Sequence, residues 1–203
     1  MIVVGLTGGI ASGKSFIGAL LRQRGIPVVD ADQLARDVVR RGTEGFDAVI
    51  RAFPEVLLRG EIDRPALARI IYSDPVKRRK LEGIIHPRVR AEFLRQKALN
   101  AEAPLLVYEV PLLFEKGLES EMDAVIVVDV PPEIQEERLL RRSGLSVEEA
   151  NQRINSQMSR VERLSRADFI ISGLLTEEET EQALGDILPK ILKESKKKKG
   201  DDE

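Results

Sequence analysis

The sequence predicts an α/β fold built on a doubly wound parallel sheet. Short apolar runs rich in β-branched residues alternate along the chain with longer stretches in which apolar residues recur at helical spacing. The short runs are apolar at consecutive positions, which is typical of strands covered by helices on both faces. A length of 203 residues, of which 42% are hydrophobic, suits one sizeable domain with a buried core.

Five segments are expected to be strands: 2–7, 26–29, 104–110, 124–130 and 169–171. The first ends at glycines and the fourth is closed by two prolines, so turn residues punctuate the pattern. Helical spacing of apolar residues fills most of the intervals between these strands. The expected helices cover 14–24, 31–41, most of 60–97, 133–142, 146–163 and 177–192.

Composition excludes several classes of protein. The 32 Lys and Arg residues nearly balance the 34 Asp and Glu residues, and the chain has no Cys and a single His. Disulfides, thiolate metal sites and clusters of His ligands are therefore excluded, and a near-neutral chain is poorly suited to coating nucleic acid. No apolar run approaches the roughly 20 residues of a membrane span, and the N-terminus lacks the basic region of a signal peptide. We expect a cytoplasmic protein that binds neither nucleic acid nor membrane.

Charge is distributed unevenly along the chain. Residues 59–97 include 11 basic and 5 acidic residues, whereas residues 167–195 include 2 basic and 7 acidic residues. A basic middle that faces a site would suit a polyanionic small molecule, although the run Lys77–Lys80 alone is also what a solvated helix face looks like. The low-complexity tail 196–203 is expected to be disordered.

The strongest motif is a phosphate-binding loop at residues 8–15, which fits the pattern G-x-x-x-x-G-K-[ST]. It follows an expected strand and opens an amphipathic helix, as its chemistry requires. Gly8 and Gly13 let the backbone curl until N–H groups point at phosphate oxygens. Lys14 is placed to reach the β and γ phosphates, and the Ser15 hydroxyl to bind Mg²⁺. The sequence therefore predicts a fold of the P-loop NTPase type that binds a nucleoside triphosphate.

Two carboxylates follow the second expected strand. Ligands of doubly wound sheets bind beyond the carboxyl ends of the strands, so Asp30 and Asp32 are expected near the γ-phosphate. A carboxylate there orients an acceptor hydroxyl and takes its proton, and Asp32 is the candidate for that role. The alternative for either residue is a cap on the following helix. The chain has no N-K-x-D segment for reading guanine, and its length favours a small-molecule kinase over a motor.

With these motifs in place, the chain resembles the dephospho-coenzyme A kinase family over roughly residues 1–175. The phosphate-binding loop is common to many kinases, and its combination with the other motifs is far more specific. The resemblance rests on Gly5–Ser15, Val29–Asp32, His86–Pro87, Val110–Glu115, Val127–Val130, Gln135 with Arg138 and Arg142, Gln157, and Ala167–Asp168.

The resemblance implies transfer of the ATP γ-phosphoryl group to the ribose 3′-hydroxyl of dephospho-coenzyme A, the last step of coenzyme A synthesis, with Mg²⁺ as cofactor. It also implies one kinase domain over 1–195, and the sequence leaves open whether the chain is a monomer or a small homo-oligomer. The core would comprise 1–32, 104–132 and 167–192. A helical acceptor-binding insertion would span about 33–103, and a helical lid about 133–166.

Site residues also follow from the resemblance. Asp32, Lys14 and Arg138 are expected to be catalytic, and Asp32 and His86 to contact the acceptor. Ser15 is expected to bind Mg²⁺, with Asp30 and Glu109 as candidates for a further metal ligand, and Asp129, which follows an apolar strand, as a third. The expected ATP-binding residues are Gly8, Gly9, Ala11, Ser12, Gly13, Lys14, Ser15, Phe16 and Arg142.

Two other functions remain possible, and the sequence differs from the family pattern at one place. Another small-molecule kinase, acting on a nucleoside or a sugar acid, would share the loop, and so would a regulatory module that binds nucleotide without transferring phosphate. The family commonly has an Asn shortly after its last strand, near the adenine, whereas this chain reads Ile171-Ser172-Gly173-Leu174. That difference leaves the adenine contact open.

Overall fold

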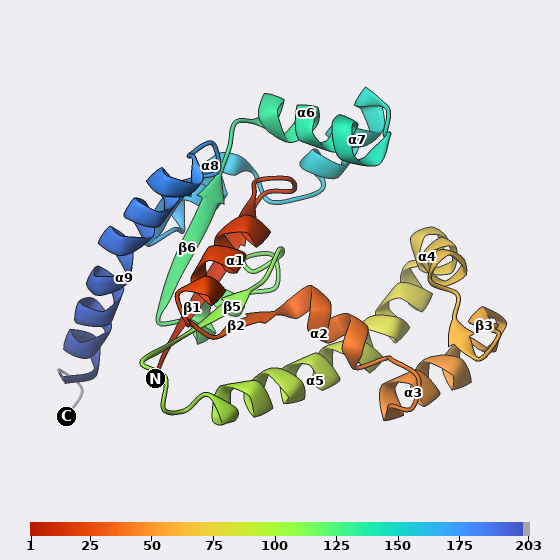
Figure 1. Ribbon diagram of the computed structural model, residues 1–203. Coiled ribbons are helices and arrows are strands. Elements are labelled where there is room, and N and C mark those ends of the chain that lie inside the picture. The colour runs from red at the N-terminus through yellow and green to blue at the C-terminus, as the bar shows by residue number, and fades with distance from the viewer. Residues whose placement is uncertain (201–203) are drawn as a thin grey trace. The chain divides into compact units, whose positions relative to one another are not determined.

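A computed structural model of the chain, shown in Figure 1, describes residues 1–194 with their side chains and follows the last helix to Gly200. The expected disordered tail, 196–203, lies outside the residues that are described in full. The chain forms two compact units, one of residues 1–29 and 100–203 and the other of Asp30–Leu99. No helix in the described part of the chain is long and apolar enough to cross a membrane.

The first unit is organised around a five-stranded sheet with the order β2-β5-β1-β6-β7. Its strands are β1 (Ile2–Gly8), β2 (Val28–Asp30), β5 (Leu105–Glu109), β6 (Ala124–Asp129) and β7 (Phe169–Ser172). β1 pairs in parallel with both β5 and β6, and β6 pairs in parallel with β7. From β1 the chain runs to the edge strand β2, returns to β5, and then crosses β1 to β6 and β7, which confirms the predicted doubly wound sheet and places its topological switch point between β1 and β5.

Helices of the first unit are α1 (Lys14–Gln23), α6 (Pro132–Ser143), α7 (Val147–Asn155), α8 (Arg160–Ser165) and α9 (Glu177–Gly200), with a 3₁₀ turn at Leu118–Glu121. The core on one face of the sheet joins the central strands to α1 and α9. Its buried residues are Ile2, Val4, Leu6, Ile17, Leu20, Leu21, Leu105, Val107, Ala124, Ile126, Val128, Ile171, Leu184 and Ile191.

The expectation of one helix over 146–163 is wrong. The structure divides this segment into α7 and α8, separated by residues 156–159. The side chain of Ser159 accepts a hydrogen bond from the Glu162 N–H and so caps a new helix. The break has a consequence for the phosphate-binding loop, because it contains Gln157.

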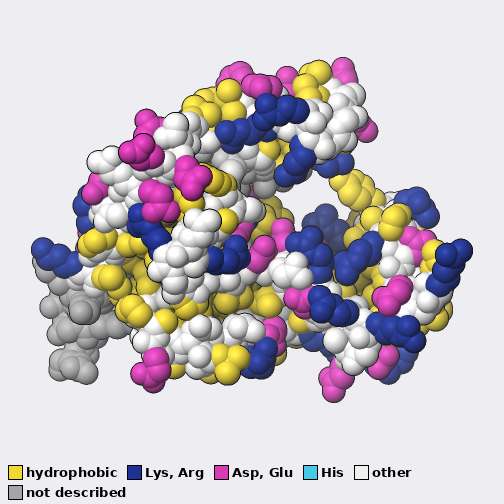
Figure 2. Space-filling view, in the orientation of Figure 1, with side chains coloured by type: hydrophobic (Ala, Val, Ile, Leu, Met, Phe, Trp, Pro, Cys, Tyr) yellow, Lys and Arg dark blue, Asp and Glu magenta, His cyan; other side chains and the backbone are white. Residues whose placement is uncertain are grey.

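The second unit is helical, with a core of its own. It contains α2 (Ala31–Asp37), α3 (Glu44–Ala52), a 3₁₀ turn (Pro54–Val56), α4 (Arg64–Ser73) and α5 (Pro75–Leu99), and α5 packs against α2, α3 and α4. The buried residues of that core are Val39, Val49, Phe53, Val56 and Leu81. Figure 2 shows many Lys and Arg side chains over this part of the chain.

Two boundaries in the second unit differ from the sequence expectation. α2 ends at Asp37 instead of Arg41. The helical middle begins at Arg64 instead of Gly60, because a short antiparallel hairpin of β3 (Leu57–Leu58) and β4 (Glu61–Ile62) precedes it. Arg59 and Gly60 both have positive φ angles, 53° and 82°, which is the backbone of a tight two-residue hairpin turn.

Candidate active site

The phosphate-binding loop joins the end of β1 to the start of α1, where the sequence predicted it. Gly13 precedes the first residue of α1 with a φ of 98°, a conformation that glycine adopts without steric cost. Lys14 and Ser15 occupy the first turn of α1, so their backbone N–H groups have no acceptor within the helix. These N–H groups and the helix dipole make the loop a site for an anion.

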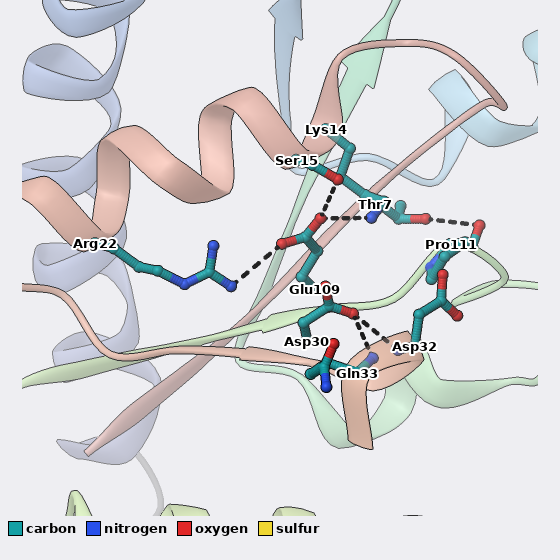
Figure 3. Close-up of polar contacts among 9 residues, drawn as sticks. All are labelled: Thr7, Lys14, Ser15, Arg22, Asp30, Asp32, Gln33, Glu109 and Pro111. Carbon is teal, nitrogen blue, oxygen red and sulfur yellow. Dashed lines mark hydrogen bonds and ion pairs between the residues drawn. The ribbon is translucent and has the colours of Figure 1, made fainter. Parts of the chain in front are cut away.

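Glu109 is the acidic residue that the structure places against this loop. It is the last residue of β5, the strand beside β1, and it is fully buried. Its Oε1 accepts hydrogen bonds from Lys14 Nζ at 2.7 Å and from Ser15 Oγ at 3.0 Å. Its Oε2 lies 3.7 Å from the Arg22 guanidinium and has no hydrogen-bond partner. Figure 3 shows the carboxylate between the loop side chains and Arg22.

The close fit of Glu109 against α1 depends on Gly18. A Cβ atom at position 18 would lie 2.6 Å from Glu109 Oε2, closer than such atoms approach. Glycine in a helix interior lowers stability by about 0.5–1 kcal/mol relative to alanine. At position 18 this loss is offset by the room that glycine leaves for the Glu109 carboxylate.

Asp30 and Asp32 have different local roles. Asp30 Oδ1 accepts hydrogen bonds from the backbone N–H groups of Asp32 at 2.8 Å and Gln33 at 3.1 Å, so Asp30 caps the N-terminus of α2 (Figure 3). Asp32 is exposed on the first turn of that helix. Its carboxylate is not part of the cap, which leaves it available to a substrate.

Arg138, from α6, binds the carbonyl groups of the loop. Its Nη1 donates to the carbonyls of Ala11 at 3.1 Å and Ser12 at 3.2 Å, and its Nη2 donates to that of Gly173 at 2.8 Å. The guanidinium therefore braces the loop and ties it to the segment after β7. The direct phosphate contact expected for Arg138 stays a prediction.

Asp129 ends β6 and forms an ion pair with Arg160 at the start of α8. The guanidinium holds both carboxylate oxygens, with contacts of 2.6 Å to Oδ2 and 2.9 Å to Oδ1. This pairing raises the pKa of Arg160, first through the hydrogen bond and then through the charge of Asp129. Burial lowers the pKa of Arg163, one turn further along α8. Asp129 is thus occupied by a cation from the chain itself.

Comparison with known proteins places this site in a family. The family model described as dephospho-CoA kinase matches residues 2–179. A dephospho-CoA kinase of Anaeromyxobacter dehalogenans is 49% identical over 175 residues, which cover 84% of this chain and 83% of that protein. The chain belongs to the dephospho-CoA kinase family.

Solved structures agree with that assignment. A crystal structure from Thermus thermophilus has a TM-score of 0.82 and 40% identity, covering 93% of this chain and 97% of the other. The dephospho-CoA kinase of Campylobacter jejuni has a TM-score of 0.70 and 28% identity, covering 94% of this chain and 97% of the other. The α/β fold of the P-loop type and the kinase class expected from the sequence are confirmed.

The residues present fit the magnesium ion that a kinase of this family would use. The Ser15 hydroxyl and Glu109 Oε1 are hard oxygen ligands that lie 3.0 Å apart, whereas Glu109 Oε2 faces the Arg22 guanidinium and α1 at Gly18. In the described part of the chain, no three His, Cys, Asp or Glu side chains form a cage for a metal. Such an open arrangement suits Mg²⁺, which keeps several waters and shares its coordination with substrate phosphates.

Three further residues predicted for the site lie outside the motif of residues 8–15. Phe16, on the first turn of α1, has 43% of its surface exposed, and Arg142 is exposed near the end of α6. His86 lies on α5 of the second unit and is also exposed. Their roles in this dephospho-CoA kinase stay predictions.

Sequence reasoning gave no role to two glutamines that contact the loop directly. Gln135 donates a hydrogen bond to the Ile10 carbonyl, and Gln157 accepts one from the Ile10 N–H. Both residues belong to the motifs that carry the family resemblance. The signal for a role was thus present, but a motif does not say which backbone group its side chain contacts.

Proposed function

We propose that this chain transfers the γ-phosphoryl group of ATP to the ribose 3′-hydroxyl of dephospho-CoA, giving CoA and ADP. The observation that carries the proposal is the intact phosphate-binding loop, with Lys14 and Ser15 held on the buried Glu109, in a chain that belongs to this family. The chemistry requires positioning and charge stabilisation, which backbone amides, Lys and carboxylates supply without Cys or a His cluster.

The loop supplies the charge stabilisation. The N–H groups at the start of α1 hold the phosphates, and Lys14 Nζ moves from Glu109 to the phosphate oxygens when ATP binds. Mg²⁺, when bound, neutralises charge on the transferring phosphate. Ser15 and Glu109 are the residues that would hold it, since the Asp30 carboxylate already caps α2.

Asp32 is the proposed general base. Its carboxylate would orient the 3′-hydroxyl and accept its proton as the new oxygen–phosphorus bond forms. The basic segment 59–97 and His86 would hold the acceptor, whose pyrophosphate carries negative charge. Residues 133–166 would act as the lid. We place the reaction in the cytoplasm, because a chain without cysteine has no disulfide that would call for an oxidising compartment.

The test is direct. Purified protein is incubated with ATP, Mg²⁺ and dephospho-CoA, and ADP and CoA are measured by chromatography. Equal amounts of ADP and CoA are expected. No CoA, together with turnover on a nucleoside or a sugar acid, would make the chain a different small-molecule kinase. ATP binding without turnover on any acceptor would make it a regulatory module.

A further inference from the structure

The backbone of Ile10, inside the phosphate-binding loop, is held by two glutamine side chains, one on its N–H and one on its carbonyl. Gln157 Oε1 accepts a hydrogen bond from the Ile10 N–H at 2.6 Å, and Gln135 Nε2 donates one to the Ile10 carbonyl at 2.8 Å. The backbone atoms fix the assignment, because an N–H needs an acceptor and a carbonyl needs a donor.

Both glutamines come from one stretch of the chain, the segment 133–166 expected to form the lid. Gln135 lies in the first turn of α6 and is 3% exposed, and Gln157 lies in the break between α7 and α8. A Cβ atom at Gly9 would lie 2.2 Å from Gln135 Nε2, so the amide packs directly on the loop backbone. Three residues after Gln135, Arg138 binds the next two carbonyls of the loop, those of Ala11 and Ser12.

These contacts surround a residue in an unfavourable conformation. Ala11 has a φ of 59°, in the left-handed region that residues with a Cβ atom rarely adopt. Such a conformation persists only when neighbouring contacts fix it. The glutamines fix the residue before Ala11, and Arg138 fixes its carbonyl. The loop therefore keeps its curled shape through side chains that lie outside its own motif.

Some of the N–H groups of the loop already have acceptors within the protein. The N–H of Ile10 is bound to Gln157, and that of Ser12 is bound to the Gly9 carbonyl. The N–H groups of Lys14 and Ser15, at the helix start, carry the anion site. The N–H groups of Ile10 and Ser12 are thus bound within the protein, whereas those of Lys14 and Ser15 lie at the helix start, where an anion binds most favourably.

We propose that Gln135 and Gln157 are positioning residues, which hold the two peptide groups that flank the Ile10 Cα atom and so keep the loop in its phosphate-binding shape. Neither residue touches the substrate in this role, and both act through the backbone of the loop. The inference rests on the proposed function for its kinetic readout, whereas its binding readout needs only that the loop binds ATP.

Changing each glutamine to glutamate should have different effects at the two sites, because Gln135 donates to a backbone carbonyl and Gln157 accepts from a backbone N–H. Gln135→Glu replaces a donor by a carboxylate facing the Ile10 carbonyl, and Gln135→Met removes the donor without adding charge. Gln157→Leu removes the acceptor, whereas Gln157→Glu keeps one. Gln152→Glu, at an exposed position of α7, is the matched control for added charge in this segment.

ATP affinity is measured by calorimetry, thermal unfolding checks the fold, and KM is determined for both substrates. Loss of one well-placed hydrogen bond lowers ATP affinity and raises KM for ATP by about tenfold in Gln135→Met and Gln157→Leu, and more in Gln135→Glu. Gln157→Glu is expected to lose less than Gln157→Leu, and KM for dephospho-CoA to stay near its original value.

Unchanged ATP affinity in folded Gln135→Met and Gln157→Leu would overturn the positioning role, and so would an equal rise in both KM values. If the wild-type chain binds ATP but does not phosphorylate dephospho-CoA, the proposed function fails while the affinity comparison still decides the positioning role. If one variant unfolds, the other substitution at the same position is used, Gln135→Glu for Gln135→Met and Gln157→Glu for Gln157→Leu.

Discussion

At the scale of single residues, one oxygen of Glu109 organises the phosphate-binding loop. Oε1 accepts from both Lys14 and Ser15, the side chains that a nucleotide and its metal would use. The pair is buried, with Lys14 12% and Glu109 1% exposed. In this state the carboxylate occupies the donors that phosphate oxygens would otherwise take, so ATP binding has to exchange one set of contacts for another.

A double-mutant cycle measures this coupling. Lys14→Ala should abolish turnover and weaken ATP binding, and should also destabilise the fold by about 3 kcal/mol, because it leaves the buried Glu109 charge with only the Ser15 hydroxyl and the more distant Arg22. Adding Glu109→Gln to Lys14→Ala should recover part of that loss. Urea unfolding of the two single variants and the double variant gives the coupling free energy. A double variant as unstable as the sum of the singles would show that the pair is not coupled.

The two carboxylates of α2 should separate in function. Asp32→Asn removes the proposed base, so turnover should fall by about 10²-fold or more while ATP binding is nearly unchanged. Asp30→Asn keeps a capping oxygen and should keep most of the turnover, whereas Asp30→Ala should cost about 1 kcal/mol of stability. Steady-state kinetics and thermal unfolding check both. Equal turnover in Asp32→Asn and the wild type would remove Asp32 from catalysis.

At the scale of secondary-structure elements, α1 is shaped by what packs against it. Gly18→Ala would place a Cβ atom 2.6 Å from Glu109 Oε2, so it should destabilise the protein by about 1–3 kcal/mol despite the higher helix propensity of alanine. Gly185→Ala in α9 meets nothing within 4 Å and should stabilise the protein by about 0.5–1 kcal/mol. Thermal unfolding of the pair checks this. Equal stabilisation by both would show that α1 tolerates a side chain at position 18.

The elements of the sheet could be predicted from sequence because each strand is a continuous apolar run, and the loop because its pattern is a direct chemical requirement. Contacts over long sequence separations could not. Nothing in the local sequence says that Gln157 meets Ile10, 147 residues away, or that Glu109 binds Lys14, 95 residues away. The hairpin at residues 57–62 was missed because its strands have only two residues each, too short for a periodic pattern.

At the scale of the whole molecule, the net charge of −2 averages a basic segment with an acidic one. The basic segment 59–97 lies entirely within the helical unit Asp30–Leu99, which has its own core. Part of that charge serves the fold, since Lys80 lies 5.5 Å from the ring centre of Phe53 and Arg78 pairs with Glu82. We expect the remainder to attract the polyanionic acceptor of the proposed function.

Salt should therefore weaken acceptor binding. Raising KCl from about 0.05 to about 0.5 M shortens the Debye length severalfold, so KM for dephospho-CoA should rise about threefold or more, with a smaller change in kcat. The measurement is steady-state kinetics at saturating ATP, with sucrose at equal osmolality as the control. A KM that does not change with salt would contradict an electrostatic role for this unit.

The proposed function depends most on the identity of the acceptor and of the atom that is phosphorylated. The most direct measurement offers γ-labelled ATP and Mg²⁺ to the protein with dephospho-CoA, a nucleoside and a sugar acid at equal concentrations, and locates the label by phosphorus NMR of the products. We predict label in CoA alone, as a 3′-phosphate monoester on the ribose. Label in another acceptor, or at another position of dephospho-CoA, would contradict the proposed function.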